Sequence, residues 1–337
     1  MKYSFIIPVY NRPDEVDELL ESMCTQTLKD FEVVIVEDGS SIPCKEVVDR
    51  YADRLNIRYY SKPNSGPGQT RNYGVERASG EYVLILDSDV VLPNGYLQAV
   101  DDELKAKPSD AFGGPDRAHP SFTPTQKAIN YAMTSFFTTG GIRGGKKKMD
   151  KFYPRSFNMG VRTEVYKALE GFSKMRFGED IDFSTRIFKG GYACRLFPEA
   201  WVWHKRRTDL HKFFKQVHNS GIARINLTKR HPGTLKLVHM LPAVFTAGCV
   251  LLLLLALITA LCGCSYFWVY LIPFALFAVI IFLDATRAEK SVGVGWRAVL
   301  AAFVQLTGYG SGFLRAVWER CILGRGEFEA FKKNFYK

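Results

Sequence analysis

The feature that most restricts the fold of this chain is a run of 47 residues, 237–283, that contains no Asp, Glu, Lys or Arg. A helix that crosses a bilayer needs roughly 20 consecutive apolar residues. The run therefore predicts two membrane spans, at about 241–261 and 267–283, joined by the tight turn CGCSY. A buried helical hairpin of a soluble protein is the alternative. It is disfavoured because residues 250–258 present no polar side chain on any face.

A third segment, residues 298–314, is less clearly a span. It has 17 residues, contains Gln305 and three glycines, and is flanked by Arg297 and Arg315. The pattern leaves three possibilities open: the segment crosses the membrane, re-enters it, or lies along its interface.

Basic residues flank the predicted spans unevenly. Residues 205–239 carry nine Lys or Arg side chains and one acidic residue, Asp209, whereas the turn at 262–266 carries no charge. Loops on the cytoplasmic side of a membrane are enriched in Lys and Arg. We therefore expect a multi-pass protein of the inner (cytoplasmic) membrane, with its N-terminal domain in the cytoplasm and the hairpin turn outside.

Within the basic linker at 205–236, basic and apolar side chains alternate in a helix-like pattern from residue 210 onward. This pattern is typical of an interfacial helix that binds anionic lipid headgroups, although an ordinary basic surface helix is an alternative. The net charge of +11 also permits nucleic acid or phosphorylated ligands. Because the basic residues crowd next to the predicted spans, no nucleic-acid partner is expected.

The seven cysteines include no C-x-x-C pair, so they signal neither a zinc site nor a thioredoxin-like motif. Reduced thiols in a cytosolic compartment are the simplest interpretation. The apolar stretch at the start of the sequence ends before Asn11 and is too short for a signal peptide. The first domain is therefore expected to stay on the side where it is made.

The first 204 residues alternate strand-like and helix-like segments. Strands are predicted at 3–9, 31–37, 56–60 and 82–86, with helices at 11–24, 44–54 and 68–78 between them. This order predicts an α/β fold with a mostly parallel sheet and helices on both faces. Ligands of such sheets bind beyond the carboxyl ends of the strands.

Two carboxylates stand at one of these strand ends. Asp87-Ser88-Asp89 directly follows the apolar run at 82–86. Residues two apart on an extended chain point the same way, about 7 Å apart. Two aligned carboxylates repel each other, but an oxygen pair of this kind suits Mg²⁺ or Mn²⁺, with a ligand's phosphates completing the shell. We therefore expect a divalent metal between this pair and a diphosphate.

Three further features carry polar groups to predicted element ends. Asp38 follows the second strand, Arg71 lies on the helix after a glycine-containing loop, and Glu179 and Asp180 begin a helix closed by two glycines. Each has a simpler alternative. An Asp before Gly-Ser makes a turn, the glycine spacing matches no phosphate-binding loop, and acids at a helix start complement its dipole.

Together these motifs resemble those of the family 2 glycosyltransferases, which have the GT-A fold. The similarity rests on SFIIPVYNRPDEVDELLESMCTQTLKDFEVVIVEDGS, GPGQTRNYGVERASGEYVLILDSDV and GEDIDFSTRI, and it covers about residues 1–205 in order. It implies a membrane-anchored member with a GT-A catalytic domain at 1–204, whose acceptor half begins near residue 110. The linker at 205–236 and a membrane domain at 237–337 with a short basic tail would follow.

The resemblance implies roles for individual residues toward the donor nucleotide and the metal. Asp89 is similar to the direct metal ligand, Asp87 to the residue near the ribose and the metal's waters, and His204 to a histidine that completes the metal shell. The nucleotide-binding positions of the family match Pro8, Tyr10, Asn11, Asp38 and Arg71, with Asp38 as the carboxylate that recognises the base.

The resemblance also implies the groups around the donor sugar. Asn158, Met159 and Gly160 match the loop that passes beneath it, and Asp180, with Glu179 beside it, matches the catalytic base of the family's Glu-Asp motif. One departure is Glu37-Asp38, where the family more often has two aspartates. A second is the absence of the Q-x-x-R-W motif of processive synthases at 216–224, which together with the small number of spans disfavours a polymer synthase.

The implied activity is inverting transfer of a sugar from a nucleotide-diphosphate donor, most commonly UDP-linked in this family. The predicted spans favour a lipid-linked or otherwise membrane-held acceptor used in cell-surface polysaccharide or glycan biosynthesis. A polyprenyl-phosphate sugar synthase is one alternative, and a non-catalytic nucleotide-sugar-binding membrane protein is another. The segment at 138–155, with four glycines and six basic residues, is either a solvated loop or a flap over phosphates.

Overall fold

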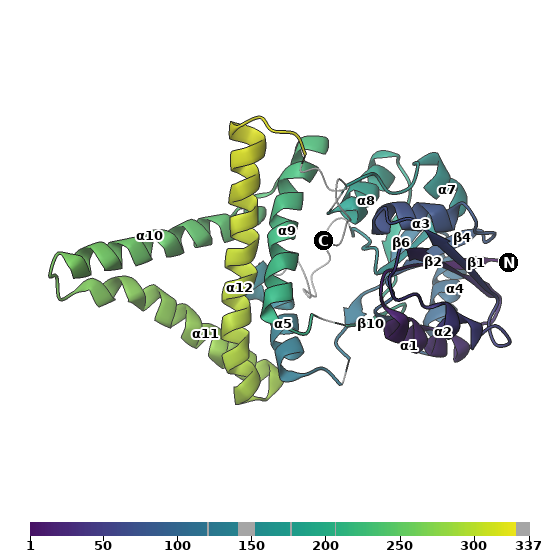
Figure 1. Cartoon of the computed structure of the whole chain (residues 1–337), viewed down its shortest axis with the longest axis horizontal. Helices are drawn as coiled ribbons and strands as arrows, with labels where there is room; N and C mark the ends of the chain where they lie inside the picture. Colours follow the sequence, from purple (N-terminus) through teal and green to yellow (C-terminus); the bar gives the residue numbers. More distant parts are fainter. Residues whose placement is uncertain (120, 141–151, 176, 206, 328–337) are drawn as a thin grey trace. The chain divides into compact units, whose positions relative to one another are not determined.

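The computed structural model describes residues 1–119, 121–140, 152–175, 177–205 and 207–327. These residues form two compact units (Figure 1). Unit 1 contains residues 1–119 and 152–205, and unit 2 contains residues 121–140 and 207–327. The structure therefore groups residues 121–140, which were expected to belong to the catalytic domain at 1–204, with the helices that follow residue 206. Residues 141–151 of the glycine-containing segment at 138–155 lie outside the described residues.

Unit 1 is built on a seven-stranded sheet in the order β3-β2-β1-β4-β8-β6-β9. The first four of these strands are parallel, as predicted, and β8 runs antiparallel to both of its neighbours. The predicted α/β class with a mostly parallel sheet is therefore confirmed. The strands are β1 (Tyr3–Val9), β2 (Phe31–Asp38), β3 (Ile57–Lys62), β4 (Tyr82–Leu86), β6 (Ala111–Gly113), β8 (Asn158–Arg162) and β9 (Cys194–Leu196).

Helices cover both faces of this sheet (Figure 1). Alternate side chains of β1 enter two separate cores: Phe5 and Ile7 pack on one face and Ile6 on the other. Gly74 allows one helix to approach closely, because a Cβ there would lie 2.7 Å from Cγ2 of Ile6. The first face carries α1 (Pro13–Cys24), α2 (Lys45–Asp49) and α4 (Tyr96–Ala106), and the second carries α3 (Pro67–Val75), α7 (Thr163–Ala168) and α8 (Glu179–Lys189).

A small second sheet has the order β5-β10-β7 and lies in the same unit. Its strands are β5 (Val90–Val91), β7 (Asp116–Arg117) and β10 (Val202–His204). β5 begins directly after Asp89, and its residue Val90 pairs with His204 in antiparallel register. This pairing places His204, at the end of β10, next to the turn Asp87-Ser88-Asp89, called the acidic turn below.

The loop expected beneath the donor sugar, residues 158–160, is part of a strand in the structure. Asn158–Arg162 forms β8, which pairs with β4 on one side and β6 on the other. Its local sequence gives little strand signal, because asparagine and glycine are depleted in strands. Pairing on both edges supplies the stabilisation, and Gly160 is required where the Phe112 ring lies against the backbone, 2.0 Å from where a Cβ would be.

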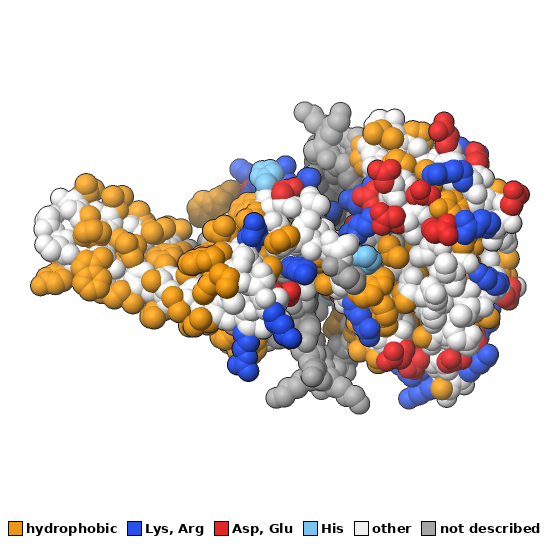
Figure 2. Space-filling view, turned by 90° about the horizontal axis from the view of Figure 1, so that it is seen from below, with side chains coloured by type: hydrophobic (Ala, Val, Ile, Leu, Met, Phe, Trp, Pro, Cys, Tyr) orange, Lys and Arg blue, Asp and Glu red, His pale blue; other side chains and the backbone are white. Residues whose placement is uncertain are grey.

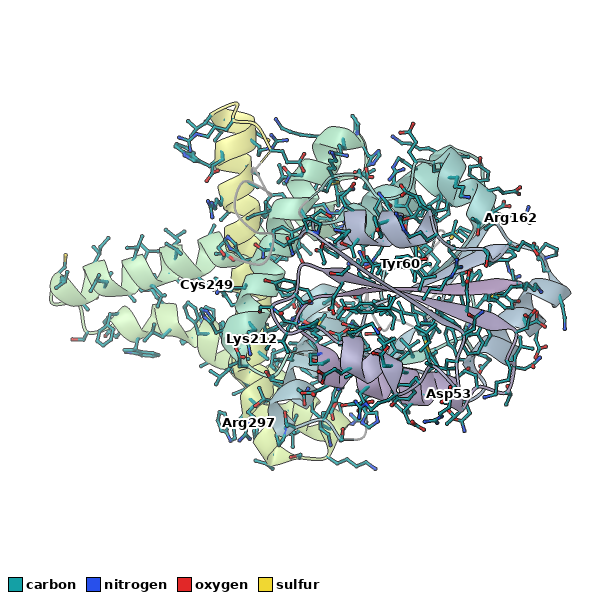
Figure 3. All side chains as sticks on the ribbon, turned by 45° about the vertical axis from the view of Figure 1, so that its right-hand side comes forward. Asp53, Tyr60, Arg162, Lys212, Cys249 and Arg297 are labelled. Carbon is teal, nitrogen blue, oxygen red and sulfur yellow. The ribbon has the colours of Figure 1, made fainter. Side chains whose placement is uncertain are left out.

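Unit 2 is helical. Its helices are α5 (Pro124–Thr134), α6 (Phe136–Thr139), α9 (Leu210–Arg230), α10 (Leu241–Leu261), α11 (Ile272–Glu289) and α12 (Val292–Ala316), with short helical turns η1 (Leu237–His239), η2 (Phe267–Leu271) and η3 (Val317–Ile322). Asp209 caps α9 by accepting a hydrogen bond from the Lys212 backbone. Lys212 of α9 and Arg297 of α12 are exposed (Figure 3).

Two helical stretches are long and apolar enough to cross a membrane, judged by length and composition. They are Leu237–Leu261, with a mean hydropathy of 2.7, and Phe267–Glu289, with 2.3. Only 6% of the apolar window of each is buried, which distinguishes them from the core helices of a soluble protein. Figure 2 shows the hairpin that they form as almost entirely hydrophobic, with Lys and Arg side chains where it joins the other helices.

The segment considered as a third span is the central packing helix of unit 2. α9 lies along α12, because Gly308 and Gly312 leave no side chain between the two backbones. A Cβ on Gly312 would lie 2.0 Å from the carbonyl oxygen of His218. Gly310 faces α10 instead, where a Cβ would lie 2.3 Å from the carbonyl oxygen of Pro242. The three glycines thus mark helix contacts, as small residues commonly do between closely packed helices.

Candidate active site

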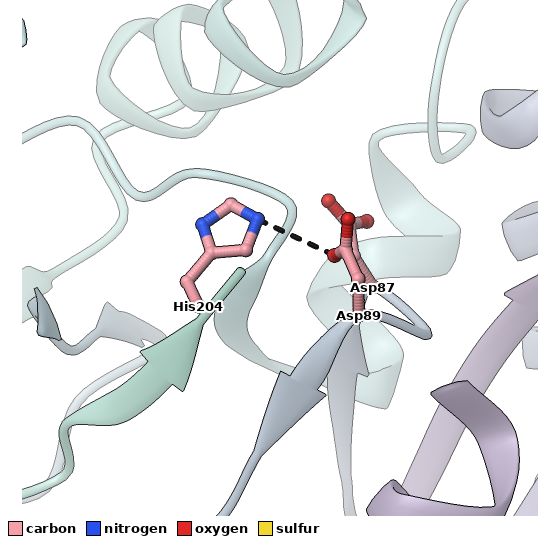
Figure 4. A group of neighbouring side chains, drawn as sticks. All are labelled: Asp87, Asp89 and His204. Carbon is pink, nitrogen blue, oxygen red and sulfur yellow. Dashed lines mark ion pairs between the residues drawn. The ribbon is translucent and has the colours of Figure 1, made fainter. Parts of the chain in front are cut away.

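Asp87, Asp89 and His204 form a cluster of candidate metal ligands (Figure 4). One ligand atom from each side chain lies within 4.8 Å of the others, and Nε2 of His204 is 3.3 Å from Oδ1 of Asp89. Two carboxylates and an imidazole are donors that suit Mn²⁺, and carboxylates also suit Mg²⁺. The residues present therefore fit the divalent metal that the sequence predicts.

The backbone brings His204 to this cluster. Its strand pairs with β5, and the amide of Lys205 donates to the carbonyl of Asp89 at 3.1 Å. The imidazole stacks on the Phe157 ring at a centroid distance of 4.8 Å. Its Nδ1 lies 3.7 Å from a carboxylate oxygen of Asp116. A carboxylate on the second ring nitrogen is the usual means of orienting a metal-binding histidine.

Arg71 connects the acidic turn to the start of α8. It is 3% exposed and donates to Oδ1 of Asp87 at 2.6 Å and to Oε1 of Glu179 at 3.0 Å. A buried guanidinium between two carboxylates fixes the orientation of both. The structure therefore brings together Asp87, Asp89, His204, Arg71 and Glu179, which are separated by up to 133 residues in the sequence.

Asp180 follows Glu179 in the first turn of α8 and is likewise buried. Its Oδ2 accepts a hydrogen bond from Nε of Arg155 at 2.6 Å, and its Oδ1 accepts one from the Ile181 amide at 2.8 Å. Burial raises the pKa of Glu179 from 4.5 to about 7, the charge of Asp180 adds to this rise, and Arg71 opposes it. The surroundings of Glu179 therefore disfavour the ionised form of its carboxyl group beside Asp180.

The raised pKa of Glu179 predicts a pH-dependent effect of Glu179→Gln on stability. The folded chain binds this proton up to a higher pH than the unfolded chain does. Stability from this group is therefore lost as pH rises from 4.5 to about 7. The variant lacks this loss, so its thermal midpoint relative to wild type should rise between pH 5 and pH 8. A difference that stays constant with pH would contradict the shift, and Glu164→Gln, at an exposed position, is the control.

The carboxyl ends of β1 and β2 carry the other predicted nucleotide-binding residues, at the same edge of the sheet as Asp87. Both oxygens of Asp38 accept hydrogen bonds from the 62–66 segment, among them Lys62 Nζ at 2.6 Å and the Gly66 amide at 2.9 Å. Asn11 has a φ of +54° and accepts bonds from the Ser41 and Ile42 amides. Here Asp38 and Asn11 shape the loops, and Pro8 and Tyr10 are half-buried beside them.

The residues predicted to lie beneath the donor sugar sit at the same edge but point into the protein. Asn158 pairs with Leu86, immediately before Asp87, yet it is 1% exposed. Its amide accepts a bond from the Tyr96 hydroxyl and donates one to the Ala200 carbonyl. Met159 is in the core. Their role toward a sugar stays a prediction, and the side-chain contacts of Asn158 and Met159 are structural.

Three residues of the site were not singled out from the sequence. Arg12 donates to Oδ2 of Asp89 at 3.1 Å, Arg155 holds Asp180, and Asp116 faces His204. The only signal for Arg12 is its place three residues after the end of the first strand, inside the motif that carries Tyr10 and Asn11. Arg155 stood out only as one of the six basic residues of the segment at 138–155, and Asp116 carries no local signal.

Residues 4–169 match the sequence profile of a family described as Glycosyl transferase family 2. An uncharacterised glycosyltransferase of Rickettsia felis (strain ATCC VR-1525 / URRWXCal2) is 34% identical over 137 residues, which are 41% of this chain and 22% of that protein. EpsJ of Bacillus subtilis (strain 168), also an uncharacterised glycosyltransferase, is 25% identical over 206 residues, 58% of this chain and 59% of its own. The matches thus span less than two thirds of these relatives' length.

Two solved structures share the fold. The mannosyltransferase PcManGT from Pyrobaculum calidifontis, in complex with GDP-Man and Mn²⁺, superposes with a TM-score of 0.67 at 16% identity, over 95% of this chain and 88% of that one. TarS 1–349 of S. aureus, in complex with UDP, gives a TM-score of 0.50 at 20% identity, over 96% and 92%. These similarities confirm the expected GT-A fold.

Proposed function

This chain belongs, through residues 4–169, to the family 2 glycosyltransferases, and from that premise we propose that it transfers a sugar from a nucleoside-diphosphate donor to a membrane-held acceptor with the help of a divalent metal. One observation carries the proposal. Asp87, Asp89 and His204 converge within 4.8 Å at the carboxyl edge of the sheet, and Arg71 links them to Glu179, the neighbour of Asp180. The candidate metal ligands and Asp180, the candidate base, are therefore connected through Arg71 and Glu179.

The donor end of the site would be held by the acidic turn. Asp87, Asp89 and His204 are the residues that would bind Mn²⁺ or Mg²⁺, and a bound metal supplies positive charge against the departing diphosphate. Arg71 fixes Asp87 through a 2.6 Å bond, and Arg12 places a second guanidinium 3.1 Å from Asp89. The two guanidinium groups also reduce the electrostatic repulsion between Asp87 and Asp89.

Asp180 is the proposed base at the acceptor end. It takes the proton of the acceptor hydroxyl while that oxygen forms a bond to the anomeric carbon and the bond from this carbon to the diphosphate breaks. The attack comes from the face opposite the leaving group, so the configuration inverts. Arg155 holds Oδ2 of Asp180 and orients the carboxylate.

The donor is proposed to be a UDP-linked sugar, as in most of the family. PcManGT was solved with GDP-Man and TarS with UDP, so a GDP-linked donor is the competing possibility. Asp38, Pro8, Tyr10 and Asn11 would line the base pocket at the ends of β1 and β2. For Asp38 this requires that one of its present bonds to the 62–66 segment be exchanged for one to the base.

The acceptor is proposed to lie at the cytoplasmic face of the inner membrane, with the α10–α11 hairpin crossing the bilayer. A polyprenyl-linked saccharide for surface polysaccharide or glycan assembly fits this position. Lys236, Arg287 and Lys290, at the base of the hairpin, favour anionic lipids there, whereas its tip carries no charge. A bare polyprenyl phosphate is the alternative acceptor.

A donor panel tests this function. The full-length protein in proteoliposomes is given UDP- and GDP-linked sugars with Mn²⁺ or with a chelator, and with either a membrane lipid extract or a pure polyprenyl phosphate. Metal-dependent transfer to the extract supports the proposal, and transfer to the bare phosphate identifies the synthase alternative. Donor binding without hydrolysis or transfer in any arm would indicate a non-catalytic binding protein and overturn it.

A further inference from the structure

One face of α12 and of the η3 turn that continues it carries large apolar side chains that nothing in the described structure covers. Their exposed fractions lie between 42% and 62%. They fall at helical spacing in two triplets: Val292, Trp296 and Leu300 are four residues apart, and so are Leu314, Trp318 and Ile322. The step of 14 positions from Leu300 to Leu314 makes about four turns, so both triplets share one stripe.

The hairpin leaves α12 from the same stripe, between the two triplets. Phe303, which lies within this interval, contacts Phe245 of α10 and Phe277 of α11, with ring centroids 6.0 Å and 5.1 Å apart. The remaining faces of α12 pack against α9 and α5. The uncovered apolar stripe and the apolar hairpin therefore face the same side of unit 2.

Charges border this stripe. Arg297 and Arg315 are exposed and each follows a stripe residue directly, Trp296 and Leu314. Lys236, Arg287 and Lys290 are exposed where the hairpin begins and ends. Tryptophan next to arginine is favoured at the headgroup level, where the ring is half in hydrocarbon and the cation reaches phosphate. α10 and α11 project from the middle of α12 and run across its axis (Figure 1), so a hairpin that crosses the bilayer leaves α12 along the membrane plane.

We propose that α12 lies flat in the plane of the membrane interface and docks its stripe, Val292, Trp296, Leu300, Leu314, Trp318 and Ile322, onto a bilayer containing anionic lipid. The proposal rests on the membrane attachment stated above. It makes α12 neither a third span nor a re-entrant segment. α12, which is about 37 Å long, would lie across the base of the hairpin. The stripe is continuous with the hairpin and is bordered by arginines, and both features favour a bilayer as the surface that covers it.

Depth-dependent quenching of tryptophan emission tests this arrangement. Single-tryptophan variants of the full chain, with the other tryptophans replaced by Phe, are reconstituted in phosphatidylcholine–phosphatidylglycerol vesicles whose lipids carry bromine near the glycerol or near the chain end. The probes on α12 and its η3 continuation, called the α12 probes below, are native Trp296, native Trp318, Leu300→Trp and Thr307→Trp. Leu254→Trp and Ile280→Trp, on exposed positions of the hairpin, are the reference probes. Far-ultraviolet circular dichroism checks that each variant is folded.

All four α12 probes should lose more emission to shallow bromines than to deep ones, whereas the two hairpin probes should show the reverse. A span would place position 307 near the centre, about 16 Å deeper than positions 296 and 318. That gradient, or α12 probes that escape all quenching while the hairpin probes respond, would overturn the in-plane arrangement and leave the membrane proposal intact. If the hairpin probes also escaped quenching, both would be wrong.

Discussion

Asp89→Asn should lose nearly all metal-dependent glycosyl transfer. Asp89 is the carboxylate that lies 3.3 Å from His204 and at hydrogen-bond distance from Arg12, so it is the centre of the candidate metal cluster. A metal at a developing phosphate charge is worth several kcal/mol of transition-state stabilisation. The loss in kcat/KM should accordingly be about 10³-fold or more. Initial rates measured across a Mn²⁺ titration give this value.

The control for this variant is Asp53→Asn, which removes an exposed carboxylate from unit 1 (Figure 3). Isothermal titration of Mn²⁺ with UDP-linked donor should show that Asp53→Asn binds as wild type does and that Asp89→Asn does not. Wild-type rates and metal affinity in Asp89→Asn would show that the cluster of Asp87, Asp89 and His204 holds no catalytic metal.

Asp180→Asn should keep donor binding and stop transfer. Asparagine preserves the shape of the side chain and can still face Arg155, but it cannot accept the acceptor's proton. A general base contributes about 10²–10⁴-fold to a rate, so kcat should fall by that factor while the donor's Kd changes little. Single-turnover transfer and donor titration, run on the same sample, separate the two quantities.

A conservative variant of the neighbouring arginine distinguishes a base from a merely structural role. Arg155→Lys keeps a positive charge beside Asp180 and should retain a measurable part of the activity. Transfer at the wild-type rate by Asp180→Asn would show that another group takes the proton.

The parallel core of unit 1 follows from its sequence because β1, β2 and β4 are largely apolar runs followed by polar residues. β4 is the clearest case, since all five of its residues are buried and Asp87 follows at once. β8 could not be predicted in this way. Its residues Asn158 and Gly160 are poor strand formers, and the strand exists because β4 and β6 supply partners on both edges.

The candidate site, too, was predictable from the sequence only in part. Asp87, Asp89 and His204 were predicted as metal ligands, and the structure brings their ligand atoms together. Arg12 and Arg155 were not predicted, because ion pairs between residues 77 or 25 positions apart leave no mark on the local sequence.

The third segment illustrates a pattern that fits two structures. Gln305 and the glycines at 308, 310 and 312 only weakened the prediction of a span. In the structure these glycines are the points where α9 and α10 approach α12. A count of apolar residues cannot separate a helix that crosses the bilayer from one that packs closely against other helices, because both are apolar.

The course of the chain between its two units has a practical consequence for preparing unit 1 in soluble form. Residues 124–134 form α5, which lies between strands of unit 1 in the sequence but buries Ile129 and Met133 in the core of unit 2. Tyr131 of this helix also donates a hydrogen bond to Asp284 of α11. A fragment that ends at residue 205 would lack the packing partners of α5 and would expose the apolar face of this helix. Such a fragment should aggregate unless α5 is redesigned as well.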